Sequence, residues 1–113
     1  MRQTEIKQNI GENMIRFKSM MPEFTEGYSA LNAEAYADGD IPSKHKRLMA
    51  LCTALTHGCK GCILYQLSYA LDGGATVDEV LETVAVSIAI GGTMAAAEST
   101  RVMAYLKEID LIE

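Results

Sequence analysis

Two cysteines three positions apart, Cys59 and Cys62, have the clearest capacity for chemistry in this chain. Thiols at this spacing can close into a disulfide, supply half of a metal site or lie unreactive in a core. Gly58 precedes the pair and an apolar run begins at Ile63, so the pattern predicts that the pair opens a helix. The unpaired N–H groups and positive dipole end of a helix start lower a cysteine pKa from about 8.5 to about 3.5–7.5. The resulting thiolate attacks disulfides and peroxides, and the neighbouring thiol resolves the product.

Other interpretations of the pair stay open at this point. Cysteine is among the most buried residue types, so both thiols could be inert core residues. A closed zinc site needs four ligands; His57, Cys59 and Cys62 supply three, and the third thiol, Cys52, belongs to an apolar helix face. We therefore expect neither a metal nor a cofactor. His57 is a candidate for stabilising the thiolate or shuttling protons, although a histidine at a helix end often only favours the negative dipole end.

The segments around the pair have helical spacing, and no run shows strand alternation, so the chain is predicted to be all-α with about six helices. In the first two segments the apolar faces are expected to be Ile6, Ile10, Met14 and Phe17, and then Phe24, Tyr28 and Leu31 after Pro22. Ser43 is predicted to cap a helix that ends at His57, with Gly58 in the left-handed conformation beyond it.

Sequence signals also bound the helices that follow the cysteine pair. Gly73-Gly74 is predicted to end the CxxC helix, on which Tyr65 and Tyr69 lie four apart and either line one groove or pack. The stretch Thr76–Glu79 is a capping box. Gly91-Gly92 is expected to separate a helix from Val77 to about Ile90 from a last helix reaching about Ile109.

Composition restricts the class of protein. A chain of 113 residues with 49% hydrophobic residues suits one domain. Its net charge of −5 opposes nucleic-acid binding. We find no run of the roughly 18 apolar residues that a membrane span needs, and no apolar core of a secretion signal. Three cysteines fit a reducing compartment, so we expect a cytoplasmic protein without membrane or nucleic-acid partners. The apolar stretch Val84–Ile90 and the Ala/Met face after it indicate a homo-oligomer.

A combination of short motifs resembles a known family. The motifs are Lys46–Leu51, Cys59–Tyr65 with its CxxC, Gly73–Val80 with its Gly-Ala-Thr, and Gly91-Gly92. Together they resemble the alkylhydroperoxidase D-like members of the carboxymuconolactone decarboxylase family, over roughly residues 40–105 of a single domain spanning 1–113. The combination is far more specific than the CxxC alone.

The resemblance implies an alkylhydroperoxidase D-like helical bundle that assembles as a homotrimer or homohexamer. It also implies a thiol peroxidase in which Cys62 attacks the peroxide, Cys59 resolves the sulfenic acid to a disulfide, and a dithiol donor reduces that disulfide. The decarboxylase branch of the family generally lacks the CxxC, so its presence argues against lactone decarboxylation.

Two positions depart from the family pattern. Arg47 stands where a glutamate is typical, and Gln66 stands where a histidine is typical. Those family residues form a proton relay, whereas glutamine takes no proton at neutral pH and arginine cannot act as a base. We therefore expect a thiol–disulfide oxidoreductase with weakened peroxidase activity, with His57 as a candidate substitute for the histidine. The alternatives are a non-catalytic oligomeric binding or scaffold protein and, less consistent with the CxxC, a decarboxylase.

Overall fold

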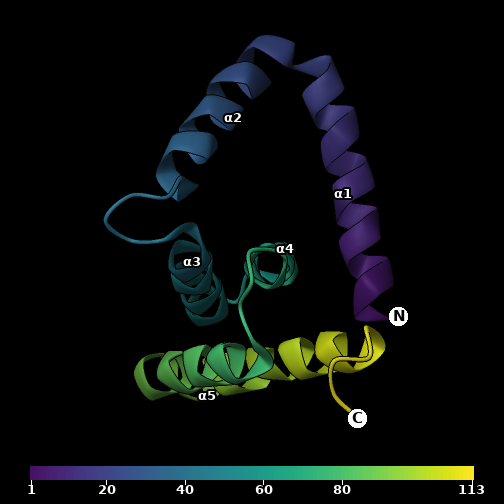
Figure 1. Cartoon of the computed structure of the whole chain (residues 1–113). Helices are drawn as coiled ribbons and strands as arrows, with labels where there is room; N and C mark the ends of the chain where they lie inside the picture. Colours follow the sequence, from purple (N-terminus) through teal and green to yellow (C-terminus); the bar gives the residue numbers. More distant parts are fainter.

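The computed structural model describes all 113 residues and contains five helices and no strand, which confirms the all-α prediction (Figure 1). The helices are α1 (Gln3–Met20), α2 (Pro22–Tyr36), α3 (Ser43–His57), α4 (Lys60–Asp72) and α5 (Val77–Glu108). The prediction of six was one too many because the last two segments join into α5. The chain bends there instead of breaking, at Gly92 with φ 70° and ψ −149°.

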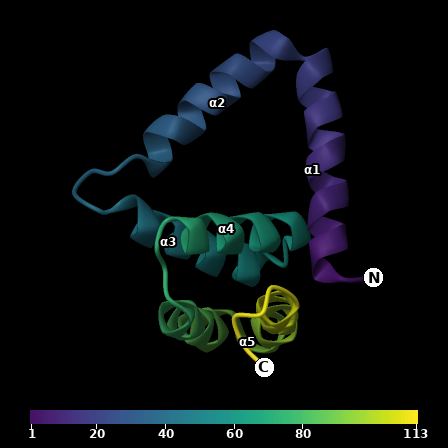
Figure 2. The same ribbon diagram turned by 45° about the vertical axis from the view of Figure 1, so that its right-hand side comes forward.

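The core lies where α3, α4 and α5 meet (Figure 2). Helix α3 packs against both of the others, and four side chains at this junction, Leu51, Leu55, Ile63 and Leu64, are completely buried. These residues lie on the apolar faces that their helical spacing predicted. The cysteine pair therefore sits at the start of a helix whose opposite face is fixed in the core.

Helices α1 and α2 form an arm, residues 3–36, that projects from this core as two sides of a triangle (Figures 1 and 2). Neither helix buries a single residue completely. Met14 and Phe17, on the predicted apolar face of α1, stay exposed in the single chain, because only the N-terminal half of α1 approaches α4 and α5 (Figure 2). The apolar side chains left exposed on the arm are Met14, Ile15, Phe17, Met20, Met21, Phe24, Tyr28 and Leu31.

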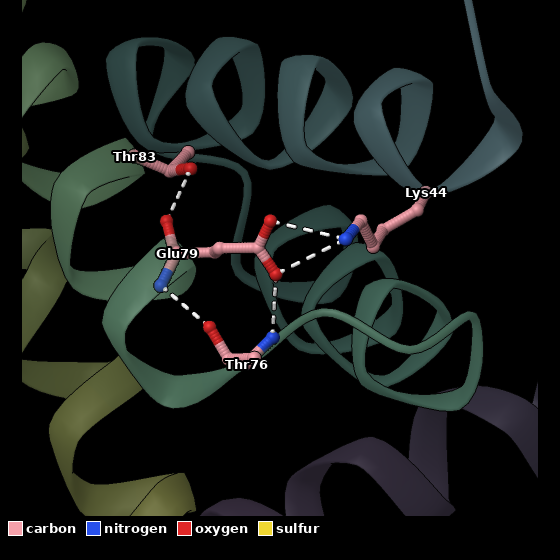
Figure 3. Close-up of polar contacts among 4 residues, drawn as sticks. All are labelled: Lys44, Thr76, Glu79 and Thr83. Atoms are coloured by element: carbon pink, nitrogen blue, oxygen red, sulfur yellow. Dashed lines mark hydrogen bonds and ion pairs between the residues drawn. The ribbon is translucent and has the colours of Figure 1, made fainter.

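Local caps set most of the helix boundaries as expected. Gly58 ends α3 with φ 69°, and Thr76 opens α5 through the predicted capping box with Glu79. Figure 3 shows that the Glu79 carboxylate also binds Lys44 at the start of α3, at 3.1 Å, which ties two helix starts together. The prediction for Ser43 was wrong. It is the first helical residue, and its N–H is bound by the Asp38 carboxylate at 2.7 Å.

The long helix α5 is more apolar than the core alone requires. By length and composition it could cross a membrane, contrary to our expectation that no segment would, and only 22% of its most apolar window is buried. It is bent at Gly92 and packs along α3, as a core helix of a soluble fold does. The exposed apolar residues Val86, Ile88, Ile90, Met94 and Met103 confirm that the faces identified in the sequence are uncovered.

The arm is anchored by Glu108 at the end of α5. Its carboxylate accepts hydrogen bonds from the backbone N–H groups of Gln3 and Thr4, both at 2.9 Å, and from the Thr4 hydroxyl at 3.0 Å. Burial alone would raise the pKa of Glu108, but these hydrogen bonds and the charge of Arg2 lower it overall. Glu108 is thus the N-terminal cap of α1, supplied from the other end of the chain.

We predict that Glu108→Gln destabilises the fold by about 1 kcal/mol at pH 7, as expected for loss of a charged helix cap. The folded-state pKa lies below the unfolded value of about 4.3, so this contribution is complete above that pH and is lost as the pH falls through the folded pKa. Urea unfolding followed from pH 7 to pH 3 checks this: the gap between variant and wild type should close. Glu82→Gln, at an exposed position on α5, is the control. A gap unchanged down to pH 3 would contradict the charged cap.

Candidate functional site

The cysteine pair begins α4, as its sequence context predicted. Cys59 is the N-cap residue, and Cys62 lies in the first turn. The two cysteines form a disulfide, with Cα atoms 5.2 Å apart. The backbone N–H of Cys62 donates to the Cys59 sulfur at 3.3 Å. Because an N–H at a helix start stabilises negative charge, this N–H would stabilise a thiolate on Cys59 if the disulfide were reduced.

A cavity of about 680 Å³ lies between the arm and the core, and Cys62 lines it whereas Cys59 does not. Tyr65 and Tyr69 line it too, so of the two alternatives left open for them, a shared groove and simple packing, the groove is present in the structure. The remaining lining residues are Ile10, Gly11, Met14, Ile15, Lys18, Tyr28, Ser29, Asn32, Ala33, Arg47, Gly61 and Gln66. The sequence did not indicate that residues of the arm line this cavity. The apolar spacing of the arm helices shows that a face is apolar but not which part of the protein it contacts.

The two positions that depart from the family pattern contact each other in this cavity. The Arg47 guanidinium donates to the Gln66 side-chain oxygen at 3.1 Å, from α3 to α4. Its central carbon lies 3.6 Å from the ring centroid of Tyr36 and 4.5 Å from that of Tyr69. Gln66 is one helical turn beyond Cys62. A charged, stacked guanidinium thus occupies the region where a proton relay would lie.

Helix α1 crosses α4 directly over the cysteine turn. A methyl group at Gly11 would overlap the Tyr65 hydroxyl, and one at Gly61 would lie 3.3 Å from Ile10. The Tyr65 hydroxyl donates to the carbonyl of Lys7 at 3.0 Å. Burial, with smaller contributions from Tyr69 and Tyr105, raises the pKa of Tyr65 above its ordinary value. Close approach at Gly11 therefore sets the position of the arm against the site.

We predict that Gly11→Ala displaces Tyr65 and destabilises the protein by about 1–3 kcal/mol, the usual cost of overpacking. Gly27→Ala is a matched control on α2, because a methyl group there meets nothing within 4 Å. Since alanine favours a helix over glycine by about 1 kcal/mol, the control should be neutral or stabilising. Thermal unfolding of both variants checks this. Equal effects at the two positions would show that the α1–α4 contact is unimportant.

The other sequence candidates lie outside this cavity. His57 is exposed at the end of α3 and is not among the residues that line it. Its role as a substitute proton donor stays a prediction. Cys52 is the free cysteine and lines a separate apolar cleft of about 370 Å³ with His45, Leu48, Met49, Thr83 and Val86. The structure therefore brings Cys62, but not His57, to the same cavity as Arg47 and Gln66.

Comparison with known proteins identifies relatives along nearly the whole chain. The model of the carboxymuconolactone decarboxylase family matches residues 22–105. An uncharacterized protein of Cupriavidus necator is 28% identical over 110 residues, which is 95% of this chain and 97% of that protein. An uncharacterized protein from the cox locus of Paracoccus denitrificans is 29% identical over 85 residues, 75% of this chain and 77% of that protein.

Solved structures have the same fold. A carboxymuconolactone decarboxylase family protein of Legionella pneumophila superposes with a TM-score of 0.88 at 28% identity, covering 94% of this chain and 95% of that one. A Thermotoga maritima family protein, described as possibly involved in antioxidative response, gives a TM-score of 0.69 at 27% identity, over 75% of this chain and 88% of that one.

Proposed function

The chain belongs to the carboxymuconolactone decarboxylase family, and from the position of its CxxC pair we propose that it is a thiol–disulfide oxidoreductase. One observation carries this proposal: Cys62 opens onto a cavity while its disulfide partner caps α4. An incoming molecule can therefore reach one sulfur, and the helix start stabilises the other as a leaving group.

Reduction of the disulfide proceeds by two exchanges. A substrate thiolate attacks the Cys62 sulfur, an S–S bond forms between them, and the Cys59–Cys62 bond breaks with its electron pair going to Cys59. The Cys62 N–H that already contacts the Cys59 sulfur then stabilises that thiolate. A second substrate thiolate attacks the substrate sulfur of the mixed disulfide and releases Cys62 as a thiolate. Two thiolates become one disulfide, two electrons reach the protein, and the cycle runs in reverse to reduce a disulfide substrate.

Peroxide reduction is the slower activity of this site. There Cys62 thiolate would attack the peroxide oxygen, become a sulfenic acid and expel an alkoxide or hydroxide that needs a proton. Neither Arg47 nor Gln66, which hydrogen-bond each other, exchanges a proton readily at neutral pH. General acid–base help of this kind typically contributes about 10²–10⁴-fold, so its absence favours disulfide over peroxide substrates.

We further propose that the protein is a homo-oligomer, a trimer or hexamer. The exposed apolar side chains of the arm and of α5, such as Ile90 at 78% and Leu31 at 67% exposure, would be covered by further copies. Light scattering should give three or six times the chain mass; a monomer would refute the assembly. A dithiol donor completes the cycle, and a reducing cytoplasm is the compartment that supplies one.

The function is tested with reduced protein mixed separately with hydrogen peroxide, an alkyl hydroperoxide and bis(2-hydroxyethyl) disulfide. We expect the Cys59–Cys62 pair to oxidise reversibly. Bis(2-hydroxyethyl) disulfide should oxidise the pair faster than it oxidises free cysteine, and the rate advantage of the pair over free cysteine should be smaller with the two peroxides. The non-catalytic alternative, a binding protein that uses the same cavity, predicts oxidation no faster than free cysteine with all three reagents. Cys52→Ser is the background variant, because it removes the thiol in the separate cleft.

A further inference from the structure

The charged side chains that line the cavity beside Cys62 are all positive. Two of its lining residues are cations, Lys18 from α1 and Arg47 from α3, and none of the fifteen is aspartate or glutamate. Neither cation forms an ion pair, since the three salt bridges in the structure involve other residues. In a protein with a net charge of −5, this is a local reversal of sign next to the reactive sulfur.

The Arg47 guanidinium is held in one orientation by its neighbours but makes only one hydrogen bond. Tyr36 and Tyr69 stack on the guanidinium, and one hydrogen bond joins it to Gln66. A guanidinium carries five N–H donors in a rigid fork that matches a carboxylate. The rings and the amide fix the plane of the group without neutralising its charge, so the ordering cost of binding an anion is already met by the fold.

From this arrangement we propose that Arg47 binds the carboxylate of the thiol or disulfide substrate, with Lys18 contributing positive charge from the arm. The inference rests on the proposed disulfide exchange and adds the substrate class: a small organic acid that bears sulfur. The apolar and aromatic lining residues Ile10, Met14 and Tyr28 would contact the rest of that molecule. Arg47 is thereby a specificity residue, and it lies on α3, next to the helix α4 that carries the reactive Cys62 sulfur.

The test compares three reductants of similar size on the disulfide form of the whole protein: 3-mercaptopropionate, neutral 2-mercaptoethanol and cationic cysteamine. Each rate for wild type is divided by the rate for Arg47→Gln, which cancels the intrinsic reactivity of the reagent. Arg47→Gln should slow 3-mercaptopropionate about ten- to hundredfold, the usual worth of a charged hydrogen bond, and leave 2-mercaptoethanol within about threefold. Added salt should reduce the wild-type preference for the anion.

Lys60→Gln is the matched control, since Lys60 adjoins the cysteines but does not line the cavity. It should leave the ratio between anionic and neutral reagents unchanged. Equal slowing of all three reagents by Arg47→Gln, no slowing, or the same loss of preference in Lys60→Gln would overturn the inference.

Failure of disulfide exchange would be recognised separately. If no reagent reduces the wild-type disulfide, the proposed function is wrong, and calorimetry with unreactive 3-phenylpropionate decides the anion site. Binding to wild type that is lost in Arg47→Gln would support carboxylate recognition. No binding to wild type, or equal binding to both proteins, would overturn it.

Discussion

Replacing Cys62 by serine will reduce disulfide exchange to the rate of the uncatalysed reaction, a loss on the order of 10³-fold or more, as for removal of other enzymatic nucleophiles. The two cysteines differ in surroundings: Cys62 lines the cavity and Cys59 is the N-cap of α4. Cys59→Ser will therefore still react once at Cys62, but it has no thiol to expel the substrate. It will accumulate a mixed disulfide, which intact-mass measurement detects directly.

Cys52→Ser is the control for this prediction, because Cys52 lies on α3 in a different cleft, and its exchange rate should equal that of wild type. The assignment would be reversed if the mixed disulfide accumulated in Cys62→Ser and not in Cys59→Ser. That result would mean that substrates approach the N-cap sulfur by a route other than the cavity.

Local features of the fold were predictable because the interactions that set them are local. Gly58, the Thr76–Glu79 capping box and the start of α4 at the cysteine pair involve residues within a few positions of one another. The apolar spacing of α3 and α4 likewise identified the faces that meet in the core. By contrast, Ser43 had an alternative five residues away in Asp38, and the rule for caps does not choose between them.

The arrangement of the arm could not be predicted, because periodicity shows that a face is apolar but not what covers it. Phe17 and Phe24 have the spacing of core residues, yet in the single chain they remain exposed, with their ring centroids 6.0 Å apart and Phe24 stacked on Tyr28. The contact of Glu108 with Thr4 joins residues 104 positions apart. The cavity depends on such pairings, so its charge became apparent only when the arm placed Lys18 on the same cavity as Arg47.

The hydrogen bond between Arg47 and Gln66 indicates how peroxidase activity could be introduced. Their side chains meet at 3.1 Å, one helical turn from Cys62, so a carboxylate at position 47 would face an imidazole at position 66. In the double variant Arg47→Glu with Gln66→His, the imidazole can take the Cys62 proton and return it to the leaving oxygen. We expect the rate constant with hydrogen peroxide to rise about 10²–10⁴-fold, the range of general acid–base catalysis.

The single variants separate a working relay from a simple change of charge. Gln66→His alone leaves the imidazole beside the cationic Arg47, which disfavours its protonated form, so the gain should be much smaller. Arg47→Glu alone supplies no group that shuttles a proton near pH 7 and should give no gain. Additive effects of the two substitutions, or no gain in a double variant with wild-type helicity, would contradict the idea that these positions decide between peroxide and disulfide substrates. A strongly non-additive gain would show that the fold retains the geometry of the relay and that two side chains determine which substrate it reduces.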